Sequence, residues 1–200
     1  MPYEYRRMTP EQREAVVHLR KARGFPLHAP PHPLNDKAYY LLTAANFEHK
    51  RIMTSAQRRT EFQKLVLEKL SEAEIEIAAW VFLANHYHLL AFVPIFPKLS
   101  FLFNGLHGAT SRQWNMEDGL TGKRKVWYQF ADRMIRGEPH FYSTLNYIHY
   151  NPVKHGYTKR MDAWEWSSFS WYLEKKGREW LVEIWKKYPI TGYGEKWDIF

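Results

Sequence analysis

Two histidines one residue apart, His86 and His88, have a spacing that could support metal-dependent chemistry. They stand where two apolar runs, 78–83 and 89–93, meet. If these runs are strands, alternate side chains project to opposite faces, so both imidazoles share one face and Tyr87 points to the other. Imidazole is the commonest metal ligand in proteins, and two of them on a rigid strand can bind one divalent cation. A pair of half-buried sheet histidines would show the same pattern, so this stretch alone leaves both interpretations open.

A second group of interest lies in segment 141–156, which reads FYSTLNYIHYNPVKHG. In a helix its apolar residues at 141, 145 and 148 form one buried stripe. Tyr147 and Asn151, four residues apart, stand one turn above the other at the edge of that stripe. An amide oxygen is a plausible third metal ligand, and the phenol would reach whatever the metal polarises. Taken separately, Tyr147 could be a half-buried helix tyrosine, and Asn151 a helix-ending cap before Pro152.

The elements that must position these residues follow from hydrophobic periodicity. The pattern predicts strands at 38–47, 75–83, 86–93 and 126–135, and helices at 55–71, 98–116 and 139–151. The order β-α-β-β-α-β-α is typical of the split βαβ, ferredoxin-like arrangement. We therefore predict an α+β fold with an antiparallel sheet and helices packed on one face. The last helix should lie near the sheet that carries the histidines.

The ends of the chain differ in character from this central part. Residues 1–36 contain a helical pattern from Pro10 to Arg23 and then a proline-rich connector, so we expect an N-terminal arm. Residues 37–160 would form the catalytic domain. Residues 161–200 are rich in tryptophan and would pack on that domain as a C-terminal extension.

Composition narrows the class of partner. The 200 residues carry a formal net charge of +8, and 17% of them are aromatic. A basic, aromatic chain suits single-stranded nucleic acid, which is bound by phosphate contacts and base stacking. The absence of cysteine excludes disulfides, thiolate metal sites and a cysteine nucleophile. No signal-peptide core or stretch of about 20 apolar residues is present, so we expect a cytoplasmic, nucleoid-associated protein without a membrane anchor.

The quoted motifs resemble a known family. NHYHLL at 85–90 resembles the His-hydrophobic-His (HUH) motif of single-tyrosine transposases, and YIHYNPVKHG at 147–156 resembles the signature helix of their REP-associated branch, the RAYT proteins. VWYQFADRMIR at 126–136 and DAWEWSSF at 162–169 add similarity on either side of that helix. The resemblance covers about residues 38–170. Tyr87 departs from it, because relatives usually carry a small aliphatic residue there.

The resemblance implies a specific chemistry. His86, His88 and Asn151 would bind Mg²⁺ or Mn²⁺, and Tyr147 would cut single-stranded or hairpin-associated DNA through a 5′-phosphotyrosine intermediate. Relatives differ in assembly, so a monomer or a homodimer is expected. Two alternatives stay open: a protein that binds hairpin DNA or RNA without cutting, and a metal-dependent phosphodiesterase in which water attacks.

Basic residues on both sides of the tyrosine helix are the candidate DNA contacts, and each could also belong to a solvated surface. The nearer candidates are Lys154, His155, Lys159, Arg160, Arg133 and Arg136. A second set comprises Arg112, Lys123, Arg124 and Lys125.

Overall fold

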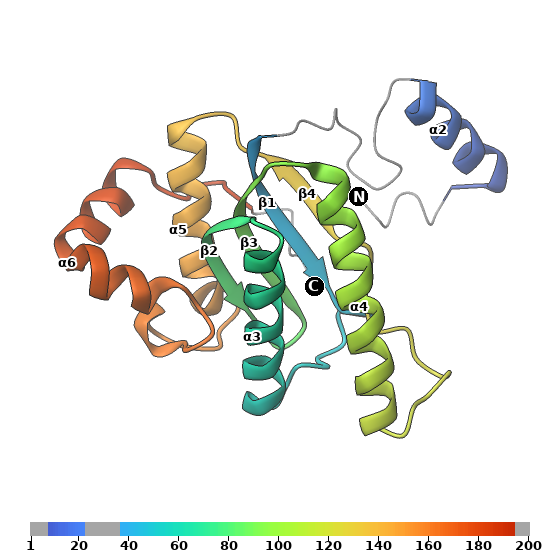
Figure 1. Cartoon of the computed structure of the whole chain (residues 1–200). Helices are drawn as coiled ribbons and strands as arrows, with labels where there is room; N and C mark the ends of the chain where they lie inside the picture. Colours follow the sequence, from blue (N-terminus) through green and yellow to red (C-terminus); the bar gives the residue numbers. More distant parts are fainter. Residues whose placement is uncertain (1–7, 23–36, 195–200) are drawn as a thin grey trace.

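The computed structural model describes residues 8–22 and 37–194 (Figure 1). Its centre is a four-stranded sheet built from β1 (Ala38–Ala45), β2 (Glu76–Phe82), β3 (His86–Val93) and β4 (Ala131–Met134). The spatial order is β2-β3-β1-β4, and every pairing is antiparallel. This order is the one expected of a split βαβ unit, so the predicted α+β class is confirmed.

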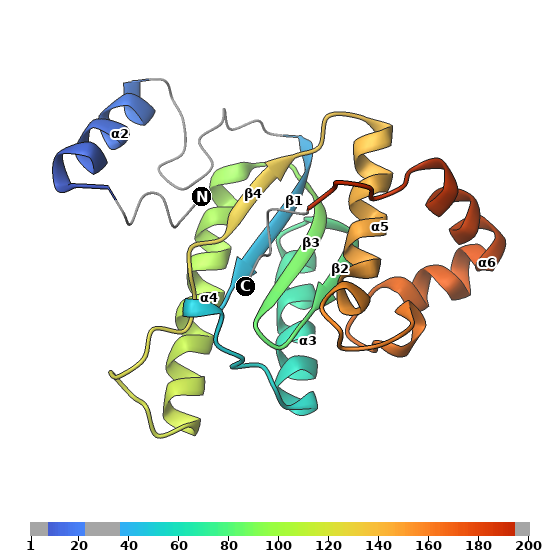
Figure 2. The same ribbon diagram turned by 180° about the vertical axis from the view of Figure 1, so that it is seen from behind.

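Helices cover both faces of the sheet, as the two opposite views show (Figures 1 and 2). On one face, α3 (Ala56–Glu72) and α4 (Phe96–Glu117) pack against side chains such as Tyr40, Leu42 and Leu89. On the other, α5 (Glu138–Lys154) packs against Leu41 and Leu90, and α6 (Phe169–Lys187) packs on α5. The prediction of helices on one face only is therefore wrong. Strand β3 is almost wholly buried on both sides, so each of its faces requires a cover.

Local signals explain where several elements begin. The Ser55 side chain accepts a hydrogen bond from the backbone N–H of Arg58 and caps α3. In α2 (Pro10–Ala22), Thr9 and Gln12 exchange backbone-to-side-chain hydrogen bonds in a capping box. The helix was predicted to end at Arg23. This residue and the proline-rich connector predicted after it lie outside the described residues.

Two predicted boundaries are wrong. The tyrosine helix was expected to end at Asn151, but α5 continues through Pro152 to Lys154. Proline removes a single donor here, and burial of both residues outweighs the local bias against helix. The fourth strand is also shorter than the predicted 126–135, because residues before Ala131 pair with the end of β1 only through an isolated bridge between Trp127 and Asn46.

Two short helices and a bend complete the fold. The 3-10 helix η1 (Phe47–His49) follows β1, and η2 (Met161–Ala163) precedes α6. Gly177, with φ of 83°, breaks α6 into two arms. Residues 161–194 contribute Trp164, Tyr172 and Leu181 to the core on the α5 face. The domain boundaries proposed from the sequence stay predictions. No helix in the described part of the chain is long and apolar enough to cross a membrane.

Candidate active site

The two histidines are the first and third residues of β3. His86 and His88 are each 1% exposed, and their ring centroids lie 5.1 Å apart. Both point to the α5 face, because strand residues two apart share a side. Tyr87 lies in the opposite core, where its hydroxyl is 2.9 Å from Nε2 of His107. The predicted alternation is confirmed.

Hydrogen bonds fix the orientation of both imidazoles through their Nδ1 atoms. Asn85 donates from Nδ2 to the carbonyl of His49 at 3.2 Å, so its Oδ1 faces Nδ1 of His86 at 2.8 Å. An amide oxygen only accepts, so Nδ1 of His86 carries the proton and Nε2 keeps its lone pair. Nδ1 of His88 lies 2.7 Å from Oγ1 of Thr43, its cross-strand partner in β1. Such partners orient metal-binding histidines in known sites.

The sequence analysis did not identify Asn85 or Thr43. A signal for Asn85 existed, since it directly precedes the histidine pair. Thr43 could be found only from the register between β1 and β3.

Asn151 faces His86 from α5. Its Oδ1 lies 3.2 Å from Nε2 of His86, and the residue is fully buried. Within residues 8–22 and 37–194, its Nδ2 has no hydrogen-bond partner. An amide oxygen and an imidazole lone pair that face each other in a buried place suit a shared cation better than a direct hydrogen bond. The residues present therefore fit a divalent metal held by His86, His88 and Asn151.

The protonation of His86 agrees with that assignment. Burial, reinforced by the neighbouring His88 and His155, lowers the pKa of His86 well below its ordinary value, so the ring is neutral at pH 7. Neutral imidazole is the form that binds metals. His155 lies 4.9 Å from His86 between ring centroids, and burial lowers its pKa to about 4. Over the described ranges, no three His, Asp or Glu side chains lie close enough together to hold a metal ion.

Tyr147 stands beside this group on α5. Its ring centroid is 5.3 Å from that of His88, and the residue is 1% exposed. The ammonium of Lys154, two turns further along α5, lies 5.0 Å from the centre of the tyrosine ring. A phenol, a cation and three candidate metal ligands thus meet at the same place between α5 and β3. The predicted convergence of Tyr147 with the histidines on one face of the sheet is seen in the structure.

The end of the described chain covers Tyr147. The Tyr193 ring lies 5.5 Å from it, and the Tyr193 hydroxyl is hydrogen-bonded to Oγ1 of Thr144. Lys154 donates a hydrogen bond to the carbonyl of Gly194 at 3.1 Å. A Cβ on Gly194 would lie 2.4 Å from Cε2 of Tyr147, so only glycine fits there. Tyr147 is therefore buried partly by Tyr193 and Gly194. No sequence pattern indicated this contact.

Comparisons with known proteins address the family. No family model matches the chain. It is 28% identical over 117 residues to the REP-associated tyrosine transposase of Escherichia coli strain K12, covering 55% of this chain and 66% of that protein. It is 29% identical over 118 residues to a putative REP-associated tyrosine transposase of Haemophilus influenzae, covering 54% and 67%. The chain is thus similar in sequence to REP-associated tyrosine transposases over about half of its length. The matches span about two thirds of the length of these relatives.

A solved structure, described as the REP-associated tyrosine transposase bound to a REP hairpin, shares the fold. Its TM-score is 0.58 at 20% identity, and the match covers 74% of this chain and 86% of that one. The resemblance to REP-associated tyrosine transposases that the motifs indicated is thus confirmed in sequence and, for the fold, in three dimensions.

The basic residues proposed as DNA contacts are placed unevenly around the transposase-like site. Lys154 and His155 adjoin it, as described above. Arg133 faces the α5 side of β4 near Tyr193, where burial lowers the pKa of the arginine. The others near the tyrosine helix are Lys159, Arg160 and Arg136, and all three are exposed. Arg160 is ion-paired with Asp162.

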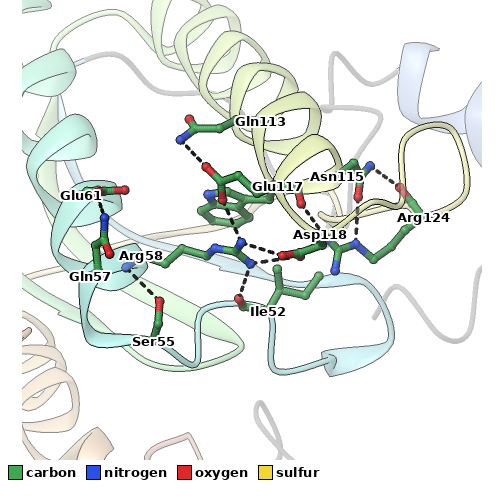
Figure 3. Close-up of polar contacts among 11 residues, drawn as sticks. Ile52, Ser55, Gln57, Arg58, Glu61, Gln113, Asn115, Glu117, Asp118 and Arg124 are labelled. Atoms are coloured by element: carbon green, nitrogen blue, oxygen red, sulfur yellow. Dashed lines mark hydrogen bonds and ion pairs between the residues drawn. The ribbon is translucent and has the colours of Figure 1, made fainter.

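In the second set of basic residues, one side chain is held by hydrogen bonds and three are exposed. Arg124 is held by Oδ1 of Asn115 at 2.8 Å and by Asp118 at 2.7 Å (Figure 3). Asp118 also binds Arg58, and these two arginines lower the pKa of Asp118 to about 2. Arg124 must leave this network to contact a phosphate. Arg112, Lys123 and Lys125 are exposed.

Proposed function

We propose that this chain cuts and rejoins single-stranded, hairpin-associated DNA through a 5′-phosphotyrosine formed by Tyr147, with Mg²⁺ or Mn²⁺ held by His86, His88 and Asn151. The observation that carries the proposal is the meeting of Tyr147 with these three side chains on the α5 face of β3. The similarity to REP-associated tyrosine transposases supports it.

The reaction is a transesterification. The Tyr147 oxygen forms a bond to phosphorus, and the bond from phosphorus to the 3′ oxygen breaks. The phenol loses one proton and the leaving 3′ oxygen gains one, which gives a free 3′-hydroxyl. Attack by a 3′-hydroxyl on the phosphotyrosine reverses the step and joins strands without ATP. When bound, the metal would neutralise charge on the phosphate oxygens and orient the scissile bond.

The protein groups around Tyr147 have separate tasks in this scheme. Asn85 and Thr43 hold the imidazoles so that both Nε2 atoms are available as ligands. The Lys154 cation, 5.0 Å from the phenol ring, favours the charge that develops on the phenol oxygen and on the phosphate. Lys154 is itself exposed, whereas Tyr147 and the three candidate ligands are buried.

The decisive experiment is the substitution Tyr147→Phe. A labelled hairpin oligonucleotide with a single-stranded flank is incubated with Mn²⁺, and covalent protein–DNA adducts are separated on a denaturing gel. Tyr147→Phe should abolish the adduct while leaving hairpin binding nearly intact. The matched control is Tyr150→Phe, since Tyr150 lies on the same helix but packs against Trp185 of α6.

Each alternative gives a different result on that gel. An adduct that survives in Tyr147→Phe would overturn the assignment of the nucleophile. A free 5′-phosphate without any trapped adduct would indicate that water attacks. Binding with no product under any metal condition would indicate a recognition protein that does not cut. Assembly as a monomer or a homodimer stays a prediction.

A further inference from the structure

Three half-buried rings gather at the end of the sheet where His86 lies. Phe47 and Tyr128 have centroids 5.0 Å apart, and His49 and Tyr128 are 5.7 Å apart. Neither Phe47 nor Tyr128 belongs to either hydrophobic core cluster. The ammonium of Lys125 lies 5.0 Å from the centre of the Phe47 ring. We call Phe47, His49 and Tyr128 the aromatic platform.

Backbone hydrogen bonds fix this platform to the candidate active site. The N–H of Asn46 donates to the carbonyl of Asn85 at 2.7 Å, and the Asn85 side chain donates to His49. The N–H of Phe47 donates to Val126 at 2.7 Å, and that of Tyr128 to Ala45 at 2.9 Å. Asn85 therefore joins the platform directly to His86, whose Nδ1 it holds. A ligand on the platform would lie next to the metal ligands.

The backbone beneath the platform is strained. Glu48 and His49 have φ values of 55° and 52°, so two consecutive non-glycine residues are left-handed. This conformation is unfavourable for residues with a Cβ and recurs where function requires a fixed local geometry. Here it follows the end of β1, and both Phe47 and His49 contact the same tyrosine ring.

We propose that the aromatic platform binds unpaired bases of the DNA strand that flanks the cleaved phosphate, and that Lys125 contacts a backbone phosphate there. Aromatic side chains with an adjacent cation are the combination that binds single-stranded nucleic acid, because every base has a face that can stack. The identity of the strand rests on the proposed function. The platform itself rests on the ring cluster, its cation and its link to His86.

The test uses the full chain without metal, so that cleavage does not enter the measurement. Two hairpins are compared by fluorescence anisotropy, one blunt and one with a single-stranded flank that carries 2-aminopurine. The variant Phe47→Leu with Tyr128→Leu keeps apolar bulk but removes two stacking faces. It should bind the flanked hairpin at least roughly tenfold more weakly, lose most 2-aminopurine quenching, and bind the blunt hairpin as the parent does.

Phe101→Leu is the matched control, because Phe101 is 83% exposed on α4 and outside the platform. It should leave the affinity for both hairpins unchanged.

Lys125→Gln should lower the slope of log affinity against log salt by about 1 for the flanked hairpin. Equal affinities of the Leu variant and the parent for the flanked hairpin, with equal thermal unfolding, would overturn the platform. An equal loss of affinity of the Leu variant for both hairpins would also overturn the platform. A platform variant that behaves as expected, together with an adduct that survives Tyr147→Phe, would refute the proposed chemistry and keep the platform.

Discussion

The Asn85 side chain links His86 to the backbone of His49. It accepts from Nδ1 of His86, donates to the carbonyl of His49, and so fixes which nitrogen of His86 carries the proton. An amide is not the only group that can accept a hydrogen bond from the Nδ1–H of a histidine. Its importance comes from geometry, because an imidazole that rotates or changes tautomer withdraws its lone pair from the metal.

At the residue scale we therefore predict that Asn85→Ala weakens divalent metal binding. Loss of a partner of this kind typically lowers metal affinity by roughly 10- to 100-fold. Isothermal titration calorimetry with Mn²⁺ on the DNA-free protein measures this affinity directly. Asn115→Ala is the control, because Asn115 is 8% exposed against 9% for Asn85 and bonds Arg124 instead of a histidine. If both variants bind Mn²⁺ as the parent does, Asn85 does not position His86.

At the scale of elements, α5 carries the proposed nucleophile, and the segment that follows α6 packs against it. Tyr147, Asn151 and Lys154 appear on successive turns of α5 because their spacing is three or four residues. Residues 190–194 then cross back over the same helix, where Tyr193 bonds Thr144 and Gly194 touches the Tyr147 ring. The nucleophile candidate is therefore positioned by one element and covered by another.

This arrangement predicts a difference between two glycine substitutions. Gly194→Ala should displace residues 190–194, since a Cβ at φ of +75° would lie 2.4 Å from Tyr147. Gly192→Ala imposes a similar backbone strain, at φ of +71°, but its Cβ meets nothing within 4 Å. Tyr147 should become more reactive toward N-acetylimidazole, read by peptide mass spectrometry, only in Gly194→Ala. The rate of adduct formation on hairpin DNA should rise in the same variant. Equal Tyr147 labelling in the two variants would contradict the covering role.

At the scale of the whole molecule, helices cover both faces of the sheet, so some polar rings are packed between a helix and the core. His107 of α4 is an example: its ring stacks on Trp127 with centroids 4.6 Å apart, and its Nε2 lies 2.9 Å from the Tyr87 hydroxyl. Burial lowers the pKa of His107 from 6.5 to about 3. Folding thus requires a neutral histidine at this position.

The consequence is a loss of stability in acid. Between pH 6.5 and about 3 the unfolded chain binds a proton at His107 that the folded chain does not, so the free energy of unfolding falls as the pH is lowered. For this group the loss between pH 7 and pH 5 is about 2 kcal/mol. His107→Gln keeps a polar side chain and removes the titration. Urea unfolding at both pH values should show a smaller loss in the variant, by up to that amount. An identical loss in parent and variant would refute a neutral, buried His107.

Much of the site could be predicted from the sequence because its parts depend on local geometry. The two-residue spacing of His86 and His88 fixes a common face in any strand, and the four-residue spacing of Tyr147 and Asn151 fixes a common edge in any helix. The cap at Ser55 and the apolar stripes of α3 and α4 likewise depend only on neighbouring residues. The family resemblance then assigned roles to residues that local patterns could only group.

Only the tertiary structure decided the contacts between segments distant in the chain. The face on which α5 packs, the cross-strand contact of Thr43 with His88, and the cover of Gly194 over Tyr147 join residues 45 or more positions apart. No local period encodes such pairs, because they depend on how the faces of a doubly covered sheet are shared among the helices. The sequence by itself determined which side chains can do chemistry. The fold decided which neighbours hold them and which residues cover the tyrosine.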